Sequence, residues 1–164
     1  LEERGGTAQG NYSAILTRPL DRTSMALIRL LERVGYRGIA NFDILSEGEK
    51  SYVLELNPRQ GRSSDYTRAA GVNLFSCLVS VLTGKKVSTD FSYREVFWHC
   101  VPTDAVRRYA TDPSLLGRAE ELIAEGADFS PFSYRPDLSH NPIRRLYTFL
   151  HGKRRTAALG EVSG

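Results

Sequence analysis

Residues 40–64 read ANFDILSEGEKSYVLELNPRQGRSS, and this stretch decides the fold that the sequence predicts. Apolar and polar residues roughly alternate from Ala40 to Leu45 and again from Ser51 to Asn57, which is the period of a half-buried strand. The polar run from Ser46 to Glu49 supplies turn chemistry between them. The stretch is therefore predicted to be a β-hairpin followed by a polar loop.

The predicted hairpin brings together three oxygen-bearing side chains. If its turn is centred near Glu49, Asp43 lies directly across from Glu55, and Asn57 lies on the same face at the strand end. Side chains paired in this way have Cβ atoms about 4.5–5.5 Å apart. Mg²⁺ prefers such hard oxygen ligands and usually takes one or two protein carboxylates together with phosphate oxygens and water. Asp43, Glu55 and Asn57 are therefore candidate metal ligands.

The loop after the hairpin has the composition of a phosphate site. Pro58 ends the second strand because it cannot donate to the ladder. Arg59 suits bidentate contact with phosphate or carboxylate, and a glycine lets the backbone approach a ligand closely. The candidate nucleotide-binding residues are Arg59, Gly61, Arg62, Ser63 and Ser64. From spacing alone, a solvated hairpin face with an Asx-type turn at Asn57 remains an open alternative.

Four short motifs follow one another between roughly Arg18 and Gly84. They are Gly35-Tyr36-Arg37-Gly38, Phe42-Asp43, Leu54-Glu55-Leu56-Asn57-Pro58-Arg59 and Ala69-Ala70-Gly71. This ordered series resembles the carboxy-terminal half of the ATP-grasp superfamily. The resemblance implies an α+β fold in which an antiparallel sheet is flanked by helices. It also implies that Asp43, Glu55 and Asn57 hold Mg²⁺, or alternatively Mn²⁺, against the phosphates of ATP, and that Arg59 is a catalytic contact to a phosphate.

The same resemblance implies an activity. Its members include carboxylate–amine ligases, in which ATP converts a carboxylate into an acyl phosphate that an amine then attacks to form an amide. The chain looks most similar to the ligases related to D-aspartate ligase, so the expected partners are ATP, a small carboxylate, an amine and, as one candidate, a peptidoglycan precursor. A carbamoyl-phosphate-synthase-like ligase shares the metal motif and remains an alternative.

Whole-chain properties limit the function classes. The chain has 164 residues, 41% hydrophobic and 25% charged, which is typical of a soluble globular protein. Its net charge of +3 favours anionic ligands without requiring nucleic acid, and none is expected as a partner. Cys77 and Cys100 form no CxxC spacing, which argues against a disulfide or a thiolate metal site and fits a cytoplasmic protein. No apolar run is long enough to span a membrane.

The sequence also predicts how the chain is divided. Residues 1–90 are expected to form a carboxy-terminal ATP-grasp subdomain, and residues 91–164 an extension that packs on the same domain. The chain does not begin with Met, and the amino-terminal domain and lid that the resemblance leads us to expect have no counterpart. We therefore expect a piece of a longer ligase that is inactive by itself and needs the missing amino-terminal part.

The sequence also predicts two helices outside the hairpin and its loop. Apolar residues at helical spacing after Asp21, including Leu27, Leu30 and Val34, predict a helix that packs in the core. A last helix is expected from Pro142 towards Leu159, with an apolar stripe of Ile143, Leu146, Tyr147 and Leu150. Its basic residues are Arg144, Arg145, Lys153, Arg154 and Arg155. Docking on its own domain is the expected arrangement. The alternative is a non-catalytic module that binds anionic lipid or nucleic acid through this helix.

Overall fold

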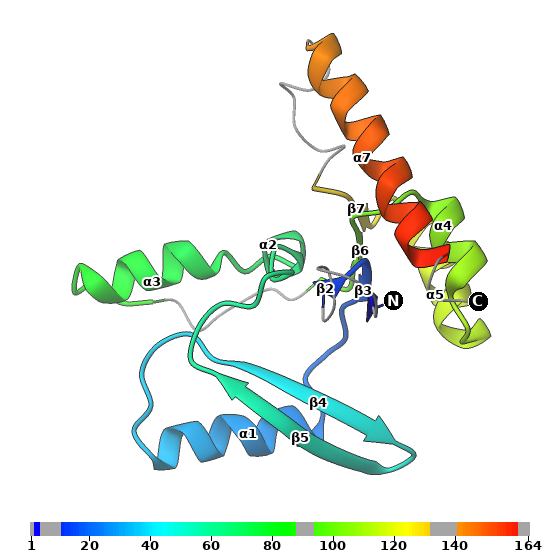
Figure 1. The fold of residues 1–164 in the computed structure, drawn as a ribbon. Coiled ribbons are helices and arrows are strands. Elements are labelled where there is room, and N and C mark those ends of the chain that lie inside the picture. The colour runs from blue at the N-terminus through cyan, green and yellow to red at the C-terminus, as the bar shows by residue number, and fades with distance from the viewer. Residues whose placement is uncertain (1, 4–10, 88–93, 132–140, 161–164) are drawn as a thin grey trace. The chain divides into compact units, whose positions relative to one another are not determined.

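The computed structural model describes residues 2–3, 11–87, 94–131 and 141–160, which form helices and small sheets (Figure 1). The α+β class predicted from the sequence is confirmed. The chain falls into two compact units: unit 1 comprises Leu1–Thr17 and Arg94–Gly164, and unit 2 comprises Arg18–Tyr93. None of the helices in the described ranges is long and apolar enough to cross a membrane.

Unit 1 is built around a three-stranded sheet. β6 (Phe97–His99) lies in the middle, antiparallel to β3 (Ala14–Leu16) and parallel to β7 (Asp128–Phe129). A separate antiparallel pair joins β1 (Glu2–Glu3) to β2 (Asn11–Tyr12). Because β3 pairs with β6, the amino-terminal strand belongs to the same unit as the carboxy-terminal residues. The division predicted from the sequence, into residues 1–90 and 91–164, places this strand with the hairpin. That division into domains stays a prediction.

Three helices complete unit 1: α4 (Thr103–Tyr109), α5 (Pro113–Ala124) and α7 (Pro142–Gly160). They bury a hydrophobic cluster against the sheet. Its members are Ala14, Phe97, Val101, Ala105, Val106, Ala119, Leu122 and Leu159. The middle strand β6 is buried over its whole length, and His99 Nδ1 lies 2.7 Å from the Val101 carbonyl oxygen. His99 is therefore hydrogen-bonded to the backbone within the buried part of unit 1.

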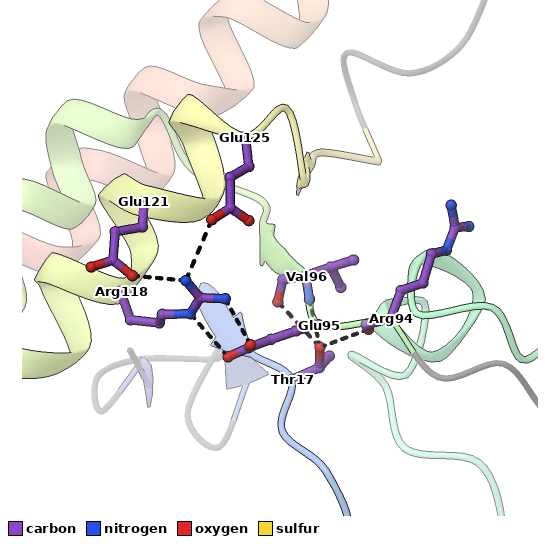
Figure 2. Close-up of polar contacts among 7 residues, drawn as sticks. All are labelled: Thr17, Arg94, Glu95, Val96, Arg118, Glu121 and Glu125. Atoms are coloured by element: carbon purple, nitrogen blue, oxygen red, sulfur yellow. Dashed lines mark hydrogen bonds and ion pairs between the residues drawn. The ribbon is translucent and has the colours of Figure 1, made fainter.

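Polar contacts fasten the strand that enters β6 (Figure 2). The Arg118 guanidinium on α5 donates to both carboxylate oxygens of Glu95, with Nη2–Oε2 2.8 Å, and to Glu121 at 2.7 Å. The Val96 backbone N–H donates to Thr17 Oγ1 at 2.8 Å, so that hydroxyl bridges the two segments at which the chain leaves and re-enters unit 1. The pKa of Arg118 is raised by these carboxylates, chiefly by the hydrogen bonds to Glu95.

Unit 2 consists of one hairpin and three helices. The hairpin is β4 (Asn41–Glu47) and β5 (Lys50–Asn57), and the helices are α1 (Arg22–Arg33), α2 (Tyr66–Ala69) and α3 (Leu74–Leu82). Asp21 caps α1 by accepting the Ser24 N–H at 2.7 Å, which also lowers the pKa of Asp21. Gly48 adopts φ +58° in the two-residue turn between β4 and β5, a conformation that favours glycine.

Candidate functional site

At the Asn57 end the hairpin has the pairing that the sequence predicts, whereas nearer the turn the register differs by one residue. Asp43 pairs directly with Glu55, and Asn41 pairs with Asn57. Because side chains alternate along a strand, the four residues lie on one face of the hairpin, which we call the polar face. Asp43, Glu55 and Asn57 are thus placed together as expected. Their role as metal ligands stays a prediction.

A register shift follows immediately after the polar face. Asp43 pairs with Glu55 but Ile44 pairs with Val53, which leaves Leu54 without an opposite residue. One extra residue on one strand is a β-bulge, a device that commonly occurs beside functional sites and redirects side chains. The bulge ends the regular pairing at the point where the carboxylates lie, and it separates the polar face from the outer part of the hairpin.

Helix α1 lies on the other face of the hairpin. Phe42, Ile44 and Ser46 alternate with Asn41 and Asp43, so they point away from the polar face. Ser51 is the cross-strand partner of Ser46, and its hydroxyl accepts a hydrogen bond of 3.1 Å from Thr23 Oγ1 on α1. This contact places α1 against the apolar face, so the helix leaves the polar face uncovered.

Asn41 is a member of the polar face that the sequence did not nominate. Its Nδ2 donates to Asp43 Oδ1 at 3.1 Å, which orients that carboxylate, and the two side chains are half-buried. Glu55 across the ladder is exposed. The signal was present in the alternation of the first strand, since Asn41 lies two residues before Asp43. Asn41 lies outside the Phe42-Asp43 motif, so the resemblance to the family does not indicate it.

The loop after β5 folds back onto this face. A Cβ built on Gly61 would lie 3.2 Å from Asn41 Oδ1, a distance closer than most such contacts allow. Ser64 N–H donates to the Gly61 carbonyl at 3.2 Å and closes a turn. Only a residue without a side chain lets the loop backbone come this close to Asn41. The loop and the polar face therefore form one continuous surface.

The two loop arginines are exposed and have no acidic partner among the residues described. Arg59 Nη1 makes one long contact of 3.4 Å with the Gln60 carbonyl, and no hydrogen bond to the Arg62 side chain is found within the described part of the chain. Arg68, by contrast, is paired with Asp65 at 2.9 Å. Arg59 and Arg62 directly follow the polar face in the chain and are exposed, so they are cations that a phosphate could bind.

The serines differ in their exposure. Ser63 is half-buried, whereas Ser64 is buried and its carbonyl accepts from the Thr67 N–H and from Thr67 Oγ1. Helix α2 has four residues and begins after Asp65, so Ser63 and Ser64 lie in the turn that precedes it. A four-residue helix also provides no extended dipole for an anion.

The donor set suits a hard divalent cation that a phosphate helps to hold. No group of three or more His, Cys, Asp or Glu side chains gathers anywhere in the described ranges. The polar face offers two carboxylates, and the third candidate is the amide oxygen of Asn57. Mg²⁺ is commonly bound through one or two carboxylates and substrate phosphates, with water completing its shell. The residues present therefore fit a Mg²⁺–phosphate site better than a metal cage made by protein alone.

Comparisons with known proteins give two distant relatives. The chain is similar to a D-aspartate ligase of Enterococcus faecium (strain Aus0004), with 27% identity over 93% of the chain and 41% of the relative. It is also similar to the carbamoyl phosphate synthase large chain of Methanosphaerula palustris (strain ATCC BAA-1556 / DSM 19958 / E1-9c), with 29% identity over 58% of the chain and 10% of the relative. The chain thus spans less than half of either. No family model matches it, and no solved structure matches significantly.

Proposed function

We propose that the chain is part of an ATP-dependent carboxylate–amine ligase of the ATP-grasp type, and that the polar face with its loop is the Mg²⁺–phosphate site. The observation that carries the proposal is the direct pairing of Asp43 with Glu55, two positions before Asn57, ahead of a loop whose Arg59 and Arg62 have no acidic partner within the described ranges. The similarity to a D-aspartate ligase and to a carbamoyl phosphate synthase large chain supports it. The motif alone, or the strand register alone, would not indicate a nucleotide site. The two together do.

Each residue has a part in this proposal. Asp43, Glu55 and Asn57 would hold Mg²⁺, or Mn²⁺ in its place, and the Asn41 amide would keep the Asp43 carboxylate oriented. The bound ion would neutralise charge on the phosphates of ATP. Arg59 would contact the transferred phosphoryl group, and Arg62, Gly61 and the nearby serines would position the remaining phosphates. Catalysis of this kind depends on positioning and charge neutralisation, which is consistent with a site that lacks an obvious nucleophile.

The substrate assignment extends the same proposal. The carboxylate would be activated as an acyl phosphate and attacked by an amine, and the likeness to D-aspartate ligase favours an amino acid joined to a peptidoglycan precursor. Because the chain covers 41% of that relative, activity is assigned to the longer protein, which would act in the cytoplasm. The 164-residue chain is expected to bind nucleotide weakly and to catalyse nothing alone.

Calorimetry of Mg²⁺–ADP binding tests the site, on the 164-residue chain and on the longest available parent protein. Asp43→Asn and Glu55→Gln keep the shape of each side chain but remove its charge. Each is expected to weaken binding by about tenfold to a hundredfold, the range seen when metal-site side chains are altered. Glu47→Gln and Glu49→Gln are matched controls on the same hairpin, because both residues are exposed and lie at its far end.

Two results would contradict the proposal. One is a parent protein that binds no nucleotide, and the other is equal binding by the site variants and the controls. The similarity to the carbamoyl phosphate synthase large chain supports a second candidate, a ligase of that type. ADP release from the full-length protein separates the two: release that requires an amino-acid carboxylate and an amine favours the first, and release that requires bicarbonate favours the second.

A further inference from the structure

Helix α7 presents an apolar stripe to solvent. We call Ile143, Leu146, Tyr147 and Leu150 the outer stripe; their exposed fractions lie between 50% and 78%. Residues three and four apart lie on one side of a helix, so the four side chains form a continuous band. A surface helix normally turns such a band towards the core. Here the band is outside, on the amino-terminal half of α7, and the helix begins at its projecting end in Figure 1.

The opposite side of α7 is the one that packs on unit 1. Gly152 lies against the Pro102 ring, to which its Cβ would be 3.7 Å distant, and Arg155 Nη1 lies 2.6 Å from Cys100 Sγ. Leu159 joins the hydrophobic cluster. At 100° per residue, Gly152 and Leu159 are displaced by about half a turn from Ile143. The helix therefore docks through Gly152, Arg155 and the buried Leu159, and keeps the outer stripe exposed. The sequence-based expectation of a docked helix holds only for its carboxy-terminal end.

The charge of α7 is of one sign. The residues from Asn141 to Gly160 include five of the 22 lysines and arginines of the chain and none of its 19 acidic residues, although the net charge of the whole chain is only +3. Arg144, Arg145 and Arg154 are exposed. At 100° per residue they lie about 100°, 200° and 20° round the helix from Ile143, so Arg154 continues the line of the outer stripe and Arg145 lies on the opposite side. Lys153 Nζ lies 4.7 Å from the centre of the Phe149 ring, another exposed apolar side chain. The helix thus combines an apolar band with cations distributed round its surface.

We propose that α7 is a membrane-surface anchor whose outer stripe inserts into the headgroup region of an anionic bilayer. An amphipathic helix with Lys and Arg beside Leu and aromatic residues lies in the interface plane and gains from both apolar burial and attraction to acidic lipids. Nucleic acid would use the cations but has no counterpart for Ile143, Leu146 and Leu150. A second copy of this chain would bring the cations of two α7 helices, which have no acidic residues of their own, close to each other. The lipid surface alone complements both features.

Vesicle flotation tests the proposal on the full 164-residue chain. Large unilamellar vesicles of equimolar phosphatidylglycerol and phosphatidylcholine are compared with vesicles of phosphatidylcholine alone. The chain is expected to float with the first and not with the second. Leu146→Ser with Leu150→Ser is expected to reduce partitioning by about tenfold or more through lost apolar burial. Arg145→Ser with Arg154→Ser is expected to reduce it by about tenfold through lost attraction to acidic lipid.

Matched controls come from unit 2. Phe75→Ser with Leu82→Ser removes two equally exposed apolar side chains from α3, and Arg29→Ser with Arg33→Ser removes two exposed cations from α1. Both pairs should leave flotation unchanged, and circular dichroism should show full helix content in all variants. The proposal is overturned if the α3 pair abolishes flotation as well, or if neutral vesicles capture the chain equally. It is also overturned if the chain self-associates without lipid through the outer stripe, or if only an oligonucleotide binds α7.

Discussion

The two units of the molecule differ in how much they bury. Unit 1 encloses a cluster of eight buried hydrophobic residues around β6, whereas in the described part of unit 2 only Ser64 and Ala70 are buried. The hairpin and α3 instead expose large apolar side chains, among them Leu54, Phe75 and Leu82. A two-stranded hairpin is marginally stable unless further strands or a helix cover one of its faces, and α1 has no buried residue. The candidate nucleotide site therefore lies in the less consolidated unit.

Because of this difference, we expect unit 1 to be stable by itself and unit 2 to gain stability from its ligand. Unit 1 can hold its shape through its own core, with the Arg118–Glu95 contact fastening β6 to α5. Unit 2 has the polar face that the proposed chemistry needs but lacks the burial that would make it rigid. A ligand that binds only the folded form adds stability in proportion to the logarithm of its concentration. Mg²⁺–nucleotide is therefore expected to stabilise unit 2 more than unit 1.

The largest expected effect follows from the core of unit 1. Leu122 is 1% exposed, so Leu122→Ala should lower the free energy of unfolding by about 2–5 kcal/mol, the range for a large-to-small change in a core. Leu82 is 75% exposed, so Leu82→Ala should change the free energy of unfolding by less than about 0.5 kcal/mol. Hydrogen exchange read amide by amide should place the loss in α5 and β6. Equal loss of protection in β4 and β5 would mean that the units unfold together, which would remove the distinction.

Local structure was predictable from the sequence because its causes are local. The alternation of residues 40–57 predicted the hairpin. The pairing of Asp43 with Glu55 was also expected, but it depends on the bulge at Leu54, because regular pairing from the Gly48-Glu49 turn would place Leu54 opposite Asp43. Asp21 and Asn73 cap α1 and α3 by accepting the backbone N–H three residues further along the chain. Capping and strand pairing depend on residues a few positions apart, so the chain itself carries the information.

Burial was not predictable in the same way. Helix α1 exists as expected, but the prediction that it packs in the core is wrong, since none of its residues is buried and Val34 is exposed. Helix α7 continues through Gly152 and turns its apolar stripe outward. Whether an apolar stripe is covered depends on which distant segments meet it, and periodicity does not contain that information. The contact of Gly61 with Asn41 was missed for the same reason.

The site can be perturbed without changing either carboxylate. Gly61→Ala would place a methyl group 3.2 Å from Asn41 Oδ1, so the Asn41 side chain must move and its hydrogen bond to Asp43 must weaken. We expect Mg²⁺–ADP binding to fall by about fivefold, equivalent to about 1 kcal/mol. Combining it with Asn41→Ser should remove most of that penalty, and a double-mutant cycle by calorimetry measures the coupling. Additive effects would show that the loop does not act through Asn41.

Gly117 supplies the matched control for this change. It lies inside α5 with nothing within 4 Å of a Cβ built on it. Gly117→Ala should therefore leave nucleotide binding unchanged and stabilise unit 1 by about 0.5–1 kcal/mol, because alanine favours the helix.

The smallest expected effect concerns the acid stability of unit 1. Glu120 on α5 accepts two hydrogen bonds from Arg107 on α4, at 2.6 and 2.9 Å, and these bonds hold the pKa of Glu120 below its ordinary value of 4.5. A carboxyl with a lowered folded pKa contributes stability that is fully present above pH 4.5 and is lost as the pH falls through the folded value. Glu120→Gln should therefore lower stability slightly at neutral pH and make the acid limb of a pH–stability curve shallower.

Glu49→Gln on the hairpin turn should leave the acid limb of unit 1 unchanged. An identical limb for Glu120→Gln and the parent chain would show that the Arg107 pair, though well formed, is screened by solvent and does not couple α4 to α5.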